Sequence, residues 1–239
     1  MHAAAMQIAA ADPGPLLDER SLLAALPLAG ARALELGCGT ARQTRALVET
    51  GKFGAILALE ADQLQHGRNL EISDLPGVRF GLGGAEDTGC SAASCDAVFL
   101  FKSLHHVPLN RLDEAFAEMH RVLAPAGLVY ISEPIFQGAY NALLALFHNE
   151  QAVRQAAFDA TVRAVASGQF TLLSQTFFLA PVRYRDWPAF ERAVIGVTHT
   201  QHRLAPALLA EVRARFMAHM TDQGVYFEAP FRVDLLQRR

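Results

Sequence analysis

Two glycines and two acids are the residues of this sequence best placed to do chemistry. Gly37 and Gly39 follow an apolar run and precede a helical pattern, which predicts a buried strand that turns sharply into a helix. A turn without Cβ atoms lets a ligand rest against the backbone. Glu35, two residues before the first glycine, favours a cationic ligand over a diphosphate. Glu60 ends the next apolar run, about 20 residues beyond Gly39, where a βαβ unit brings a carboxylate to ribose hydroxyls.

One residue counts against a dinucleotide at this turn. A dinucleotide site at this spacing needs a third small residue where Arg42 stands. Together with Glu35, Arg42 therefore disfavours a nicotinamide-dependent oxidoreductase, although the predicted strand–turn–helix unit is compatible with one.

Alternating strand and helix patterns position these residues. We expect strands at 33–36, 55–60, 77–82, 96–101 and 128–132, and helices at 16–26, 40–50, 62–74 and 110–123, the last capped by Asn110. The strand from Asp96 is continuously apolar after its first residue, as expected for a parallel strand covered on both faces. The pattern predicts an α/β fold, with ligands bound at the carboxyl ends of the strands.

Four segments carry a family resemblance. Glu-Leu-Gly-Cys-Gly-Thr at 35–40 resembles the first motif of the class I S-adenosylmethionine-dependent methyltransferases. Segments 83–87, 102–107 and 121–128 resemble later motifs in the same order, and the likeness extends through Pro134. The resemblance implies a Rossmann-like, doubly wound seven-stranded sheet, mostly parallel with a C-terminal antiparallel hairpin.

The same resemblance implies S-adenosyl-L-methionine as cofactor and methyl transfer as the reaction. The positions that it assigns to cofactor binding are Glu35, Gly37, Cys38, Gly39, Glu60, Ala61, Ala85, Glu86 and Lys102. Gly84 replaces the acid that meets the adenine amino group in the family, so we expect Glu86 or the backbone of Ala85 to take over that contact.

The reacting groups are less specific. His105 and His106 follow the fourth strand and are candidates for a general base, or else pack the loop. Tyr140 and Phe147 are candidates for an acceptor pocket, or else the core of a helical cap.

Other side chains have weaker claims. Arg183 and Arg185 suit either a carboxylate-bearing acceptor or a solvated strand end. His199 and His202 are three apart, but no third ligand is nearby in the sequence, so no metal site is predicted.

We interpret residues 1–239 as a single domain. It comprises an N-terminal helical segment (1–30), a cofactor-binding core (31–134) and a sheet-completing part with a helical cap (135–239). Segments 135–168 and 186–221 are expected to lie over the carboxyl edge of the sheet. The closing strand, 225–236, is expected to break at Pro230.

Composition narrows the function classes. The chain is 51% hydrophobic, has no apolar run of membrane-spanning length and carries three cysteines, which predicts a cytoplasmic protein with no membrane partner. A net charge of −3 without a dense basic cluster disfavours nucleic acid as partner. We expect a small-molecule, largely apolar acceptor and leave a homodimer open. A non-catalytic S-adenosylmethionine-binding regulatory protein is the main alternative; a nucleic-acid methyltransferase is less favoured.

Overall fold

The computed structural model describes residues 6–196 and 203–239, so His199 and His202 lie outside the described residues. Its centre is an eight-stranded sheet in the order β3-β2-β1-β4-β5-β8-β6, with β7 paired to β8 off this path. The strands are β1 (Ala31–Leu36), β2 (Phe53–Glu60), β3 (Val78–Leu82), β4 (Cys95–Phe101), β5 (Leu123–Pro134), β6 (Phe170–Tyr184), β7 (Met220–Thr221) and β8 (Gly224–Arg238).

Strand direction confirms the predicted fold class. Strands β1 to β5 pair in parallel, whereas β8 runs antiparallel to both β5 and β6. The carboxyl ends of β1 to β5 therefore share one edge of the sheet, at which ligands bind in open α/β folds.

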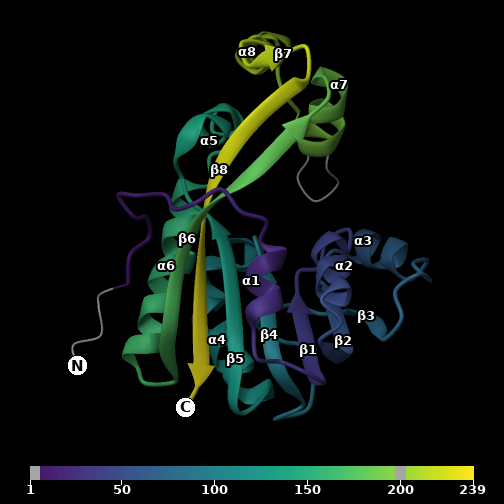
Figure 1. The fold of residues 1–239 in the computed structure, drawn as a ribbon, viewed down its shortest axis with the longest axis vertical. Helices are drawn as coiled ribbons and strands as arrows, with labels where there is room; N and C mark the ends of the chain where they lie inside the picture. Colours follow the sequence, from purple (N-terminus) through teal and green to yellow (C-terminus); the bar gives the residue numbers. More distant parts are fainter. Residues whose placement is uncertain (1–5, 197–202) are drawn as a thin grey trace.

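Helices cover both faces of the sheet (Figure 1). The longer helices are α1 (Arg20–Ala25), α2 (Arg42–Glu49), α3 (Gln63–Asn69), α4 (Leu112–Val122), α5 (Gly138–Leu144), α6 (Gln151–Ala166) and α8 (Pro206–Met217). Shorter turns form α7 (Trp187–Phe190), η1 (Leu104–His106), η2 (Leu109–Arg111) and η3 (Glu191–Ile195). No helix in the described ranges is both long and apolar enough to cross a membrane.

Strand alternation divides the core into two clusters. Leu34 and Leu36 pack with α4 and α6 on one face, and Ala33 packs with α1 and α2 on the other. By the same alternation, Glu35 faces α2 and Glu133 faces the side of α4 and α6. These two carboxylates are consequently buried within the fold, with 1% and 3% of their surface exposed.

A third apolar cluster forms a cap above the carboxyl edge. It joins α5, α7 and α8 to the projecting ends of β6 and β8 around Trp187, Phe190 and Phe216 (Figure 1). The prediction that segment 186–221 forms a cap agrees with this arrangement over its described residues. Segment 135–168 divides: α5 joins the cap, but α6 packs on the sheet face, since Ala157, Ala160 and Ala164 belong to the cluster with α4.

Two local predictions were wrong. Helix α4 begins at Leu112 with no side-chain cap, so Asn110 does not cap it. Strand β8 continues through Pro230, whose carbonyl accepts from the Ile135 amide just beyond the end of β5. The missing N–H of Pro230 faces the same side, where β5 has already ended, and therefore breaks no ladder hydrogen bond.

Candidate active site

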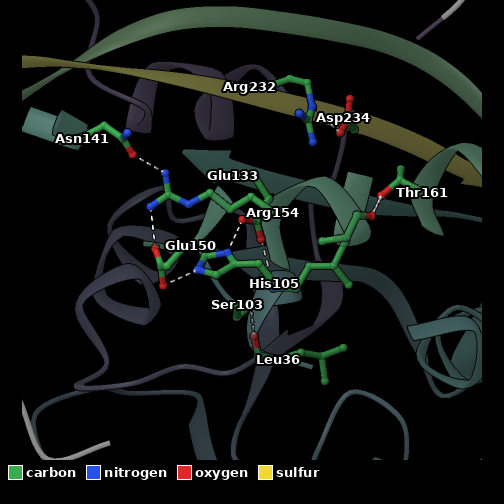
Figure 2. Close-up of polar contacts among 12 residues, drawn as sticks. Leu36, Ser103, His105, Glu133, Asn141, Glu150, Arg154, Thr161, Arg232 and Asp234 are labelled. Carbon is green, nitrogen blue, oxygen red and sulfur yellow. Dashed lines mark hydrogen bonds and ion pairs between the residues drawn. The ribbon is translucent and has the colours of Figure 1, made fainter. Parts of the chain in front are cut away.

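The two glycines of the first turn have different roles. Both have positive φ, +73° at Gly37 and +52° at Gly39. A Cβ on Gly37 would lie 2.7 Å from the Cβ of Ser103, whose hydroxyl donates to the Leu36 carbonyl at 2.7 Å (Figure 2). A Cβ on Gly39 would meet no atom within 4 Å. Gly37 therefore lets the ends of β1 and β4 pack, and Gly39 borders open space.

Glu60 fixes this turn to the end of β2. The Gly39 amide donates to Glu60 Oε2 at 2.7 Å, and the Asp62 amide donates to Oε1 at 2.9 Å. A carboxylate offers about four acceptor positions, so two remain for ligand hydroxyls. Asp62 caps α3 by accepting from the Leu64 amide at 2.9 Å. The Glu60 carboxylate is thus held in place beside the open face of Gly39.

Glu35 lies beneath the turn. Its carboxyl accepts from the Thr44 hydroxyl of α2 at 2.7 Å and has 1% of its surface exposed. Burial, reinforced by the nearby charge of Glu60, raises the pKa of Glu35 to about 8. Without a cationic partner, Glu35 is therefore mostly protonated at neutral pH.

Asn69 is a buried support that the sequence did not reveal. Its side-chain amide donates to the Gly39 carbonyl at 2.8 Å and lies 3.4 Å from Cys38 Sγ. Burial raises the pKa of the Cys38 thiol, which marks it as a packed, unreactive group. Nothing in the local pattern distinguishes Asn69 from any other polar helix residue.

The loop after β3 borders the same edge. Ala85 is buried in the core, whereas Ala61, after β2, is exposed. Glu86 pairs with Arg111 at 3.0 Å, and its carboxylate lies over Gly84, where a Cβ would meet it at 2.7 Å. The Glu86 side chain is thus already engaged by the protein.

Lys102 continues the edge at the end of β4. It has a φ of +55°, and its amide donates to the Ser132 carbonyl at 2.8 Å. Part of its side chain is exposed to solvent, but the surrounding protein removes much of the hydration of its ammonium group. This loss of hydration, together with the positive charge of Arg42, lowers the pKa of Lys102. Glu19 opposes that shift, which places α1 near Lys102.

His105 is enclosed by carboxylates (Figure 2). Its Nδ1 contacts Glu133, which also accepts from the Leu104 amide at 3.0 Å, and its Nε2 lies 3.4 Å from Glu150. Burial alone would lower the pKa of His105, but the two carboxylates outweigh it and raise that pKa to about 9. Both nitrogens are engaged, so the predicted role of His105 as general base finds no support in this arrangement.

The other predicted residues lie nearby or in the cap. The exposed His106 has its ring centroid 4.2 Å from that of His105. Tyr140 and Phe147 both pack against the cap cluster, and the Tyr140 hydroxyl bonds the Tyr184 hydroxyl at 2.8 Å. Burial raises the pKa of Tyr184, and the charge of Arg42 opposes that rise.

Arg183 and Arg185, at the end of β6, both contact other side chains of the protein. The Arg183 guanidinium lies 4.5 Å from the ring centroid of Tyr226, and the exposed Arg185 pairs with Asp186 at 2.8 Å. Both contacts favour a solvated strand end over an acceptor site.

A cavity of about 370 Å³ lies away from this set. Asp96, Ala126 and Gln237 are among its lining residues, which places it at the amino ends of β4 and β5. None of the predicted site residues lines it, and open α/β sheets bind ligands at the opposite ends. The carboxyl edge is therefore the candidate site.

Comparison with known proteins agrees with this fold. The fold is that of the class I methyltransferases, and residues 34–131 match the family model described as a methyltransferase domain. The predicted resemblance to the class I methyltransferases is therefore confirmed. No curated protein sequence matches the chain significantly.

Solved structures share the fold at low sequence identity. The YcgJ protein from Bacillus subtilis is 15% identical with a TM-score of 0.60, covering 92% of this chain and 97% of its own. A provisionally assigned methyltransferase from Bacillus halodurans is 13% identical with a TM-score of 0.61, covering 92% and 96%. The [4+2]-cyclase SpnF is 18% identical with a TM-score of 0.54, covering 92% and 79%. At these identities the likeness establishes the fold alone.

The buried Glu35 should make folding stability depend on pH. Its folded pKa, about 8, exceeds the ordinary value of 4.5, so between these values the folded state keeps a proton that the unfolded state releases. Stability is therefore lost as pH rises through this window, by up to about 1.4 kcal/mol per pH unit. Urea unfolding between pH 5 and 8 should show a flatter profile for Glu35→Gln than for the parent.

The exposed Glu71 provides the matched control. Glu71→Gln makes the same chemical change without burial and should reproduce the parental profile. Equal slopes for the parent and Glu35→Gln would contradict the assignment of a buried, protonated Glu35.

Proposed function

We propose that this protein transfers a methyl group from S-adenosyl-L-methionine to a small-molecule acceptor. The observation that carries the proposal is the Glu60 carboxylate, which the Gly39 amide holds at 2.7 Å beside the open face of that glycine. The methyltransferase domain at residues 34–131 supports the same reaction class.

The fold offers a group for each polar part of the cofactor. The free acceptor positions of Glu60 suit the two ribose hydroxyls. Glu35 would ionise on meeting the ammonium group of the cofactor's amino-acid end, since an opposite charge offsets the cost of burying a carboxylate. The backbone at Ala85 is the best candidate for the adenine, because Arg111 already engages the Glu86 side chain.

Methyl transfer asks little further of the protein. The sulfonium supplies its own leaving group, so the remaining tasks are to align the acceptor with the methyl and to exclude water. The cap is suited to both, since its aromatic cluster stands above the carboxyl edge (Figure 1).

An acceptor held between cap and sheet would meet mostly apolar surface. Tyr140 and Phe147 lie on the cap, and the Tyr140–Tyr184 hydroxyl pair adds one polar contact. We therefore propose a largely apolar acceptor with a polar group near the methyl.

Charge disfavours nucleic acid as acceptor. The net charge is −3, and affinity for duplexes depends on many phosphate contacts made by basic side chains. The cytoplasm is the proposed compartment, and a homodimer is compatible with this function.

Cofactor identity can be tested by calorimetry. S-adenosylhomocysteine should bind, and Glu60→Ala should weaken binding by about 1.5–3 kcal/mol through lost hydrogen bonds to a charged group. Asp62→Ala is the control, because it removes the helix cap that follows Glu60 but no proposed ligand contact. Tight binding of NADH without any binding of S-adenosylhomocysteine would refute the proposed function.

Acceptor selection can be separated from cofactor binding. A panel of apolar phenols, amines and carboxylic acids is screened for acceptor-dependent formation of S-adenosylhomocysteine. Phe147→Ala should reduce turnover of the best acceptor at least about tenfold, while its affinity for S-adenosylhomocysteine changes by less than about 0.5 kcal/mol.

Tyr226→Phe is the control variant, at an aromatic residue of β8 beside the cap. Tyr226 lies on the solvent-exposed side of β8, and its substitution should change neither quantity. Parallel loss of cofactor affinity and turnover in Phe147→Ala would place Phe147 at the cofactor and contradict the cap assignment.

A further inference from the structure

Three metal-ligating side chains converge at the carboxyl edge of β4 and β5. His105 and His106 lie on η1, and Glu150 immediately precedes α6. One ligand atom from each of them lies within 4.8 Å of the other two. Glu150 belongs to a segment far from the two histidines in the sequence, so sequence spacing gives no sign of the cluster.

The distance between His105 and Glu150 matches that between two ligands of one metal ion. His105 Nε2 and Glu150 Oε1 are 3.4 Å apart. Two ligands bound tetrahedrally at about 2.0–2.1 Å are separated by about 3.4 Å. His148 lies beside the cluster, and its Nε2 is hydrogen-bonded to the same Glu150 oxygen at 2.8 Å.

The surrounding groups orient the ligands as second-shell partners do in metal sites. Glu133 holds Nδ1 of His105, which directs Nε2 toward Glu150 (Figure 2). Arg154 donates to the other Glu150 oxygen at 2.6 Å and to Asn141 at 2.9 Å. Both ligand side chains are thereby fixed before any ion arrives.

We propose that His105, His106 and Glu150 bind one divalent transition metal ion. Two imidazoles with one carboxylate suit zinc, whereas magnesium prefers oxygen ligands and retained water. Glu133 and Glu150 carry two negative charges, which the protonated His105 and Arg154 balance, so a divalent ion would bind by displacing the proton of His105. This proposal departs from the sequence-based expectation that the chain holds no metal.

The site's position suggests its use. Ser103, two residues before His105, contacts the Gly37 turn, so the metal would share the carboxyl edge with Gly39 and Glu60. An open coordination position there would hold an oxygen or nitrogen of the acceptor and lower the pKa of its proton. This role rests on the proposed methyl transfer, whereas metal binding itself does not.

The test is zinc binding by the full-length protein, without cofactor or acceptor. After dialysis against a chelator, calorimetric titration should show one tight zinc per chain and at least tenfold weaker binding of magnesium. His106→Ala removes an exposed ligand and should weaken zinc binding at least tenfold without unfolding the protein. Glu150→Gln keeps the side-chain volume and should weaken binding to a similar extent.

His66→Ala is the matched control. His66 lies on α3, outside the cluster, and its removal should leave zinc affinity unchanged. Circular dichroism verifies that each variant is folded. Absence of tight zinc binding, or equal zinc affinity in the parent, His106→Ala and Glu150→Gln, would overturn the proposal. Since S-adenosylhomocysteine binding is measured separately, failure of the metal site and failure of the proposed function remain distinguishable.

Discussion

The carboxylate of Glu60 is the constraint on which the carboxyl edge depends. One side chain accepts from two backbone amides, those of Gly39 and Asp62, and so fixes the turn after β1 against the start of α3. Hydrogen bonds to an ionised acceptor are stronger than those between neutral groups. Glu60, at the end of the neighbouring strand, holds the turn after β1 in place. No side chain of the turn is needed for that purpose, and the space beside Gly39 stays open.

A second constraint is the alternation of β-strand side chains. It places Glu35 under α2 and Glu133 against η1, where each carboxyl is dehydrated and needs a partner. Thr44 gives Glu35 only a neutral hydrogen bond, so the Glu35 carboxyl keeps its proton. The protonated His105 gives Glu133 a positive charge, so the Glu133 carboxylate stays ionised. The same edge thus contains a protonated carboxyl without a cationic partner, Glu35, and an ionised carboxylate paired with a cation, Glu133.

The sequence was sufficient for features governed by short-range patterns. The apolar runs before Glu60 and after Asp96 predicted β2 and β4, and the Gly37–Gly39 turn predicted the site edge. Contacts between distant segments could not be predicted from the sequence. Asn69 of α3 donates to the Gly39 carbonyl, and Glu150, just before α6, contacts His105. The predicted break at Pro230 was wrong for a related reason: β8 can contain this proline because β5 ends before the position where its N–H would be needed. Segment 135–168 was expected over the carboxyl edge, but α6 lies on the sheet face because its alanines pack against α4, a contact between distant segments.

The central claim, that Glu60 is positioned for a ribose, is tested most directly by a ligand–protein double-mutant cycle. The affinities of S-adenosylhomocysteine and its 3′-deoxy analogue are measured for the parent and for Glu60→Ala. The account predicts that removing the hydroxyl weakens binding to the parent about tenfold or more, or about 1.4 kcal/mol, and changes binding to Glu60→Ala less than about twofold. Equal losses in the two proteins would show that Glu60 and the ribose hydroxyl do not interact, and would contradict the account.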